Sequence, residues 1–355
     1  MKGVILHGGN GTRLRPLTYT DVKQLLPIAG KPISEYALEN LIEIGIKEVN
    51  IVIGSTGGEE VKKYYGNGEK WGINITYTYQ DKPLGIAHAI GLIRNFTGND
   101  NFVVFLGDNF VQNGISNLYR NFISHNYGGM IALVKVKNPI QFGIAEVEGD
   151  RIVRLVEKPK EPKSNLAIAG VYFLTSKVFE SIDRLNPSAR GEYEITAAYQ
   201  DMVNKGLRVG YSVISGWFKD TGTVDDFLDC NRLVLDRTNG NIPESEIRGN
   251  ITGRVFLSKD SYVSDDSKIL GPCFIGSGTT IENSYIGPFT SIGPNCKIKN
   301  AEIEDSIVMD GTEISLSRNL IMRQSLIGSN VKIKTNDSTS RAMKLVLGRD
   351  SKIEL

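Results

Sequence analysis

The chain has 355 residues, which is more than a single hydrophobic core usually serves, so we expect two domains. Its 41 basic and 40 acidic residues give a net charge of +1, which argues against nucleic-acid or membrane-surface partners, because both usually require a basic patch. The cysteines (Cys230, Cys273, Cys296) lack the spacing of a disulfide framework or a zinc site. With no apolar run of about 20 residues and no secretory pattern, we expect a cytoplasmic protein.

The first predicted element is a short strand at residues 4–6, which runs into a glycine-rich loop at residues 8–14. Glycines let backbone N–H groups approach phosphate oxygens, and Arg13 and Lys23 would neutralise the charge that amides cannot. The loop lacks both the Gly-Lys-Ser/Thr ending of a P-loop and the third glycine of a dinucleotide-binding turn. It therefore indicates a nucleoside-triphosphate site that differs from both of these types. The open alternative is a surface turn that happens to carry basic residues.

Helical and strand-like patterns then alternate as far as about residue 214. Apolar residues recur at helical spacing from Ile33 to Ile44. We expect strands at 49–53, 102–106, 130–136, 169–174 and 208–214, and helices at 115–124, 176–185 and 195–205. This alternation predicts an α/β fold with a mixed, mostly parallel sheet covered by helices.

Two aspartates follow or flank these strands. Asp108 comes directly after the strand at 102–106, where an α/β sheet collects its ligands, and Asp220 lies in the run 217–223. Two carboxylates could share one Mg²⁺, which prefers oxygen ligands and is often completed by substrate phosphates. Each aspartate taken alone could equally be a turn or cap residue. Beside a phosphate loop, the pair favours the metal.

Two further loops carry groups suited to a sugar phosphate and a base. Glu157 could accept hydrogen bonds from sugar hydroxyls, and the adjacent Lys158 could meet a phosphate. Gln80 could pair with a base edge through its amide, and Gly85 could do so through its N–H.

From about residue 250 the pattern changes to a hexapeptide repeat. Aliphatic residues recur every six positions, often before glycine, as at Ile275, Ile281, Ile286, Ile292 and Ile298. Each repeat forms one side of a triangular coil, with the aliphatic side chain pointing inward. The register breaks at 283–285 and around 300–305, and resumes near Ile327. We expect an irregular left-handed parallel β-helix that extends to residue 355.

Five motifs in this order resemble the sugar-phosphate nucleotidylyltransferases, in the long form that carries a C-terminal left-handed β-helix. The motifs are Gly8-Gly9-Asn10-Gly11-Thr12-Arg13, Lys23-Gln24-Leu25-Leu26-Pro27, Gly107-Asp108-Asn109, Glu157-Lys158-Pro159 and Asp220-Thr221-Gly222-Thr223. Further similarity lies at residues 187–192 and 217–220. The resemblance implies a Rossmann-like nucleotidyltransferase domain at 1–236. The turn-forming and charged residues that follow it predict a linker at 237–250, and the repeat predicts the β-helix at 251–355. The resemblance also implies transfer of a nucleotidyl group from dTTP to glucose-1-phosphate, with Mg²⁺ as cofactor.

The resemblance assigns roles to individual residues. Arg13, Lys23, Asp108 and Asp220 would be catalytic, and the two aspartates would hold the Mg²⁺. The residues implied to bind nucleotide are Gly8, Gly9, Gly11, Thr12, Arg13, Lys23, Gln24, Gln80, Pro83, Gly85 and Asp108. Those implied to bind the sugar phosphate are Asn109, Gly143, Glu157, Lys158 and Val171. The chain departs from the family at His7, where alanine or serine is usual, and at Phe142 and Ala197, which leaves sugar specificity open.

Three alternatives stay open at this point. The nucleotide could be UTP, with glucose- or N-acetylglucosamine-1-phosphate as acceptor, because one methyl group supplies only about 1–3 kcal/mol of discrimination. The chain could be a regulatory subunit that senses nucleotide sugars without catalysis, although its retained charged residues argue against this. The β-helix could be an acetyltransferase, but His7, His88 and His125 all precede it, so we expect a structural, oligomer-forming or regulatory role, in a trimer or tetramer.

Overall fold

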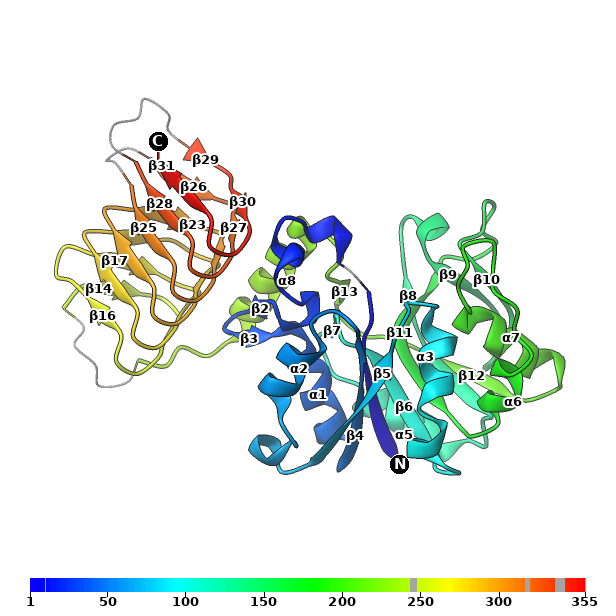
Figure 1. Cartoon of the computed structure of the whole chain (residues 1–355). Helices are drawn as coiled ribbons and strands as arrows, with labels where there is room; N and C mark the ends of the chain where they lie inside the picture. Colours follow the sequence, from blue (N-terminus) through cyan, green and yellow to red (C-terminus); the bar gives the residue numbers. More distant parts are fainter. Residues whose placement is uncertain (10, 243–247, 317–319, 336–341, 355) are drawn as a thin grey trace. The chain divides into compact units, whose positions relative to one another are not determined.

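The computed structural model describes residues 1–9, 11–242, 248–316, 320–335 and 342–354. Packing divides the chain into two compact units. The first joins residues 1–9 to 34–220 and contains a mixed sheet with helices, and the second joins residues 10–33 to 221–355 and contains a parallel β-helix (Figure 1). The described residues include no helix of the length and apolarity that crossing a membrane requires. The domain limits at 236 and 250 remain a prediction.

The sheet of the first unit is mixed. Its strands, in spatial order, are β5 (Asn74–Gln80), β4 (Glu48–Gly54), β1 (Lys2–His7), β6 (Phe102–Leu106), β11 (Leu166–Leu174), β8 (Gly129–Lys135), β12 (Val209–Val213), β10 (Arg151–Glu157) and β9 (Gly143–Glu148). The run β5–β4–β1–β6 is parallel, whereas β11 is antiparallel to both β6 and β8. The predicted α/β class with a mixed sheet is confirmed.

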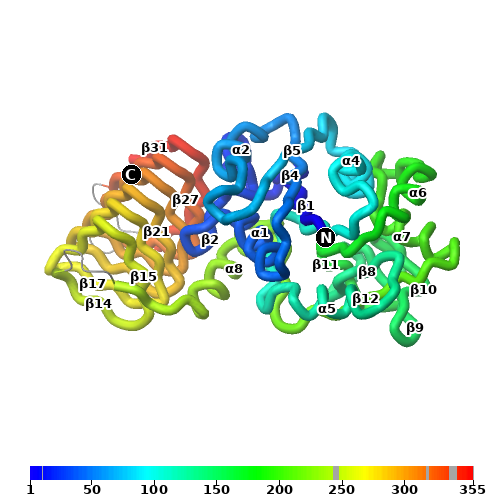
Figure 2. Tube along the Cα trace, turned by 90° about the horizontal axis from the view of Figure 1, so that it is seen from below, coloured from blue at the N-terminus to red at the C-terminus, as the bar shows by residue number. Residues whose placement is uncertain are grey.

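Helices cover both faces of this sheet (Figure 2). They are α1 (Ile33–Glu43), α2 (Gly58–Tyr65), α3 (Ile86–Leu92), α4 (Arg94–Thr97), α5 (Ser116–Ser124), α6 (Val178–Ile182) and α7 (Ile195–Asn204). On one face Phe179 of α6 stacks on Phe102 of β6, and on the other Phe122 of α5 packs against Phe173 of β11. The predicted strands appear as β4, β6, β8, β11 and β12, and the helix predicted at 176–185 is shorter than expected.

Shorter elements complete this unit. Short 3₁₀ turns lie at η4 (Glu69–Trp71) and η5 (Pro139–Gln141). A two-stranded antiparallel ribbon pairs β7 (Asn109–Val111) with β13 (Phe218–Asp220). The ribbon matters most for the site, because it pairs two segments that lie about a hundred residues apart in the sequence.

The second unit contains three parallel sheets, the arrangement of a left-handed β-helix. The first sheet holds β14 (Asn250–Thr252), β17 (Lys268–Leu270), β20 (Tyr285–Ile286), β23 (Glu302–Glu304), β26 (Ile321–Arg323) and β29 (Ala342–Met343). The second holds β15 (Val255–Leu257), β18 (Cys273–Ile275), β21 (Thr290–Ile292), β24 (Ile307–Val308), β27 (Leu326–Ile327) and β30 (Val346–Leu347). The third holds β16 (Tyr262–Val263), β19 (Thr280–Glu282), β22 (Lys297–Lys299), β25 (Glu313–Ser315), β28 (Lys332–Lys334) and β31 (Lys352–Glu354).

The repeated aliphatic residues build the interior of the β-helix. Ile275, Ile281, Ile286, Ile292 and Ile298 are all buried in one core, as predicted. The coil continues through the two segments where the repeat loses its register. Asn283, Asn300 and Asp305 there adopt positive φ, at 44°, 51° and 49°, which asparagine and aspartate tolerate better than most residues. Turns of altered length therefore absorb the irregularity.

The second unit also holds a helix and a short N-terminal segment. Helix α8 (Val224–Arg237) begins at a capping box, in which Thr223 and Asp226 satisfy each other's backbone N–H groups. The segment 10–33 contains η1 (Thr12–Leu14), η2 (Leu17–Tyr19), η3 (Lys23–Leu25) and the hairpin of β2 (Pro27–Ile28) with β3 (Lys31–Pro32). Residues 243–247 of the predicted linker lie outside the described residues.

Candidate functional site

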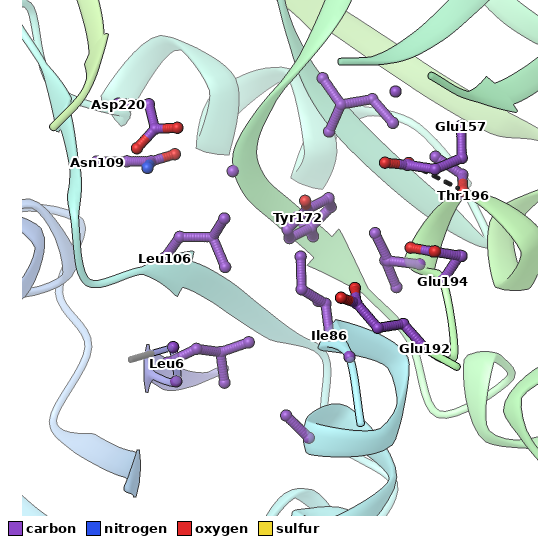
Figure 3. Close-up of a pocket in the computed structure, with 18 of the residues that line it drawn as sticks. Leu6, Ile86, Leu106, Asn109, Glu157, Tyr172, Glu192, Glu194, Thr196 and Asp220 are labelled. Carbon is purple, nitrogen blue, oxygen red and sulfur yellow. Dashed lines mark hydrogen bonds between the residues drawn. The ribbon is translucent and has the colours of Figure 1, made fainter. Parts of the chain in front are cut away.

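A pocket of about 370 Å³ opens in the first unit, within the size range of small-molecule sites. It lies where several strands end. Its lining includes predicted site residues, namely Gly8, Gly9, Gln80, Pro83, Gly85, Asp108, Asn109, Gly143, Glu157, Lys158 and Asp220. In Figure 3, Asn109 and Asp220 lie together at one end, Glu157, Thr196 and Glu194 lie at the other, and Tyr172 lies between them.

The β7–β13 ribbon brings the two predicted aspartates together. Asp220 is the register partner of Asn109, so it lies within one residue of Asp108 along the ladder. The amide of Asn109 donates to Oδ1 of Asp108 over 2.9 Å, which holds that carboxylate in place. Two carboxylates thus face the pocket from neighbouring positions, although more than a hundred residues separate them in the sequence.

This carboxylate pair matches what Mg²⁺ needs. Among the described residues no cluster of three or more histidine, cysteine, aspartate or glutamate side chains could hold a metal alone. Mg²⁺ commonly uses one or two carboxylates and takes its remaining ligands from water and substrate phosphates. Asp108 and Asp220 would form such an incomplete set of oxygen ligands if the ion bound here.

The opposite end of the pocket combines three carboxylates with one guanidinium. Arg190 donates to Glu157 at 3.2 Å and to Glu192 at 2.9 Å, and lies 3.7 Å from Glu194. Thr196 donates its hydroxyl hydrogen to Glu157 over 3.4 Å. Burial and then the neighbouring Glu194 raise the pKa of Glu157 above its ordinary value, while Lys158 and Arg190 oppose the shift. This end can accept hydrogen bonds from hydroxyl groups and offers cations to a phosphate.

Two glycines let the chain come close to these side chains. A Cβ at Gly143 would lie 2.8 Å from Cγ2 of Thr196 and 3.0 Å from Oε2 of Glu157. At Gly170, where φ is +32°, a Cβ would lie 2.0 Å from Oδ1 of Asn109. Any larger residue would displace Glu157 or Asn109. Val171 itself is fully buried, and its neighbours Gly170 and Tyr172 line the pocket.

The third wall of the pocket carries Gln80. Its Nε2 donates to the carbonyl of Gly85 at 3.2 Å and lies 2.9 Å from Nδ1 of His88. Gly85 has a φ of +100°, and a Cβ there would lie 2.6 Å from the carbonyl oxygen of Tyr193. These contacts fix the Gln80 amide and the backbone of Gly85 at the edge of the pocket.

Arg13 and Lys23, the two cations predicted to bind the triphosphate, belong to the second unit, as do their neighbours in the sequence. Gly11, Thr12, Arg13, Lys23 and Gln24 lie in the segment 10–33. A Cβ at Gly11 would lie 3.2 Å from Cβ of Lys23, so Gly11 packs against the base of the Lys23 side chain. The guanidinium of Arg13 lies against Gly222, where a Cβ would be 2.9 Å from one of its terminal nitrogens. Arg13 and Lys23 are therefore held within one structural unit.

Several pocket residues had no role assigned from the sequence. They are Arg190, Glu192, Glu194, Thr196, Tyr172 and Phe218. Arg190 and Glu192 lie in the segment 187–192 that supported the resemblance, so a signal was present. Their charges gave no sign that they would converge on Glu157, because that convergence depends on how the segment folds back beside β10.

Comparisons with known proteins show which proteins the chain is similar to. The nucleotidyl transferase family model matches residues 2–237, and the model named GMPPB C-terminal domain matches residues 251–354. The chain is 43% identical to a glucose-1-phosphate thymidylyltransferase of Streptomyces antibioticus over 100% of this chain and 99% of that one. It is 41% identical to the low-salt glycan biosynthesis nucleotidyltransferase Agl11 of Haloferax volcanii, over 100% of both.

A solved structure is also similar to a large part of the chain. A Bacillus anthracis protein, described as a glucose-1-phosphate thymidylyltransferase in complex with sucrose, superposes with a TM-score of 0.63 at 40% identity. The match covers 68% of this chain and 98% of that one. The chain belongs to the nucleotidyl transferase family.

Proposed function

We propose that this protein transfers a thymidylyl group from dTTP to glucose-1-phosphate, forming dTDP-glucose and pyrophosphate. The observation that carries the proposal is a single pocket with a carboxylate pair at one end and a mixed cluster of Glu157, Lys158 and Arg190 at the other. Such a pocket suits two phosphate-bearing substrates that meet in the middle. Two relatives named glucose-1-phosphate thymidylyltransferase are 41% and 43% identical to this chain over essentially its whole length.

The proposal gives each group of residues its own task. Gly8, Gln80 and Gly85 hold the base, and Arg13, Lys23 and the glycine loop hold the triphosphate. Asn109, Gly143 and Glu157 surround the glucose, Val171 contributes through its backbone, and Lys158 holds the sugar phosphate. We add Arg190 to this set, because its guanidinium already lies within hydrogen-bond distance of Glu157.

The reaction requires no general base. The sugar phosphate has a second pKa of about 6, so at neutral pH it is a dianion and already a nucleophile. One of its oxygens attacks the α-phosphorus of dTTP, a new phosphorus–oxygen bond forms, and the bond to the leaving pyrophosphate breaks. Alignment and cationic charge supply the catalysis. A bound Mg²⁺, held by Asp108 and Asp220, would neutralise phosphate charge.

The test is a substrate panel followed by pyrophosphate release. Each nucleoside triphosphate is combined with glucose-1-phosphate, N-acetylglucosamine-1-phosphate and galactose-1-phosphate, with Mg²⁺ or with EDTA. We expect the highest kcat/KM for dTTP with glucose-1-phosphate, slower use of UTP, and loss of activity in EDTA. A preference for UTP with N-acetylglucosamine-1-phosphate would overturn the substrate assignment. Absence of pyrophosphate release from every pair would indicate the regulatory subunit instead.

The setting of this reaction is part of the proposal. The cysteines of the described residues, Cys230, Cys273 and Cys296, are buried and are not disulfide-bonded, which suits a reducing compartment such as the cytoplasm. Sedimentation equilibrium would decide between the trimeric and tetrameric assemblies that the sequence suggests.

A further inference from the structure

The segment that bears Arg13 and Lys23 packs within the β-helix unit. In the sequence it interrupts the first unit, since residues 1–9 and 34–220 form that unit without it. The loop proposed to bind the triphosphate thus depends on the C-terminal part of the chain for its support. Four contacts show how this support is built.

The first contact is an ion pair between Asp21 and Arg349. Asp21 follows η2, and Arg349 follows β30 near the end of the β-helix. The Nε of Arg349 donates to Oδ1 of Asp21 over 3.1 Å, and a terminal nitrogen of the same guanidinium donates to that oxygen as well. The Asp21 side chain is only 10% exposed. Beside it, the carbonyl oxygen of Pro16 would lie 3.2 Å from a Cβ on Gly348, so the two backbones touch.

The second contact passes through Asn231 of α8, whose side chain is buried. Its Oδ1 accepts from the backbone N–H of Ala29 over 2.9 Å and from the hydroxyl of Ser291 over 2.7 Å. Its Nδ2 donates to the carbonyl of Phe289 over 2.9 Å. One side chain therefore joins the segment, α8 and a coil of the β-helix.

The remaining two contacts fix the hairpin and α8. Gly30, in the hairpin turn, lies so close to Phe274 of β18 that a Cβ there would be 2.1 Å from Cζ of the ring. Arg232 of α8 donates to both carboxylate oxygens of Asp305 in the β-helix. Gly222 lies just before α8 and contacts the Arg13 guanidinium. The contacts that fix α8 therefore also help to fix Arg13, a proposed catalytic residue.

Contacts within the segment also connect the part near Asp21 to the glycine loop and to Lys23. The hydroxyl of Thr18 donates to the carbonyl of Gly11 over 2.7 Å, and Gly11 packs against Lys23. A displacement at Asp21 would therefore reach both the glycine loop and Lys23 within a few residues.

We infer that the β-helix positions the triphosphate-binding loop, with Arg349 and Asn231 as the positioning residues. Arg349 holds Asp21, Asn231 holds Ala29, and the segment between these anchors carries Lys23. The inference rests on the proposed function, because it assigns the held segment to the nucleotide. It gives the β-helix a part in nucleotide binding, in addition to its structural role.

The first experiment compares Arg349→Met with Arg323→Met. Arg323 is a matched control, since it pairs with Glu304 at 2.8 Å between neighbouring coils of the β-helix and is similarly exposed. We expect Arg349→Met to raise the KM for dTTP by about fivefold, with the KM for glucose-1-phosphate unchanged, because a partly buried ion pair is lost. Arg323→Met should keep both values. Equal KM values for dTTP in the wild type and both variants would refute the inference.

Two further readouts separate this inference from the proposed function. Hydrogen exchange of the peptides from 11 to 33 should quicken in Arg349→Met and not in Arg323→Met, whatever the substrate. Exchange that is unchanged in Arg349→Met would refute the anchoring even if the enzyme is active. Asp21→Arg and Arg349→Asp should each raise the KM for dTTP, and combining them should restore it, which a general loss of stability would not do. If the wild-type chain consumes no nucleotide at all, the proposed function fails, and hydrogen exchange still decides the anchoring.

Discussion

Asp220 lies in the β7–β13 ribbon opposite Asn109, the residue that follows Asp108, and the proposed reaction assigns both aspartates to a single divalent cation. Asp108→Asn keeps the shape of the side chain but removes its charge. We expect kcat to fall by roughly a thousandfold, because charge stabilisation at the transferring phosphorus is lost. Asp100→Asn, a change at an exposed carboxylate that pairs with Lys2, is the control and should keep normal activity. A folded Asp108→Asn variant with near-normal kcat would contradict the assignment.

Glu157 provides a test that depends on pH. Burial raises the pKa of Glu157, so protonation should remove its acceptor charge at a higher pH than for an ordinary glutamate. At pH 8 we expect Glu157→Gln to raise the KM for glucose-1-phosphate by about tenfold, the value of hydrogen bonds to a charged group. The ratio of variant to wild-type KM should shrink as the pH falls towards 5. Titration of the sugar phosphate cancels in this ratio, and a ratio that stays constant with pH would count against the role of Glu157.

His7, a buried histidine beside the glycine loop, should make the stability of the fold depend on pH. Among the described residues neither ring nitrogen has a hydrogen-bond partner, and burial lowers the pKa of His7 to about 3, with Asp108 opposing the shift. Between pH 6.5 and about 3 the unfolded chain binds a proton that the folded chain does not, so the free energy of unfolding should fall as the pH falls.

His7→Ala should remove this dependence. Measured by urea denaturation from pH 7 to pH 5, the variant should gain stability relative to the wild type by about 1.4 kcal/mol per pH unit below pH 6. Other titrating groups cancel in the difference. Parallel curves for the two proteins would show that folding does not shift the pKa of His7.

Much of the site could be predicted from the sequence, because its residues lie in short motifs at strand ends. Asp108, Glu157 and Lys158 are such residues, and all three line the pocket. Arg190 could not be assigned, since nothing local shows that residues 188–194 approach β10. Gly170 could not be identified either, because its need for glycine comes from the Asn109 side chain, more than sixty residues earlier.

Helix α8 is one of several elements that the sequence-based prediction missed; α2, α3 and β5 are others. The buried side chains of α8 include Phe227, Leu228, Asn231 and Leu235, which form a helical stripe interrupted by a polar residue. Asn231 weakens the apolar pattern because it serves the contacts with Ala29 and Ser291. The sheet order was equally hidden, since β11 runs antiparallel to β6 and β8 although the strand patterns alone resemble those of a parallel sheet.

The capping box of α8 can be tested directly. Thr223→Ala removes a side chain that accepts from the N–H of Asp226 over 3.2 Å, and Asp226 also loses the Thr223 hydroxyl as a donor. We expect a loss of about 1 kcal/mol in the free energy of unfolding. Thr223→Ser keeps the cap and should stay near the wild-type value. If the denaturation curves of the wild type and both variants coincide, the cap contributes nothing to stability.

Taken together, the two units divide the proposed work of the protein. The pocket residues lie in the first unit, whereas the cations proposed for the triphosphate lie in the second. The chain passes from one unit to the other directly after Gly9 and directly after Asp220, and both of these residues line the pocket. A domain description drawn from sequence order alone assigns residues 10–33 to the catalytic part, because packing between distant segments leaves no mark on the sequence.

The most direct measurement follows the oxygen atoms of the sugar phosphate. The protein is incubated with Mg²⁺, dTTP and glucose-1-phosphate labelled with ¹⁸O in its phosphate group, and the products are analysed by mass spectrometry. Because a sugar-phosphate oxygen attacks the α-phosphorus, we expect all of the label in dTDP-glucose and none in pyrophosphate. Label in pyrophosphate, or the absence of a nucleotide sugar, would contradict the proposed transfer.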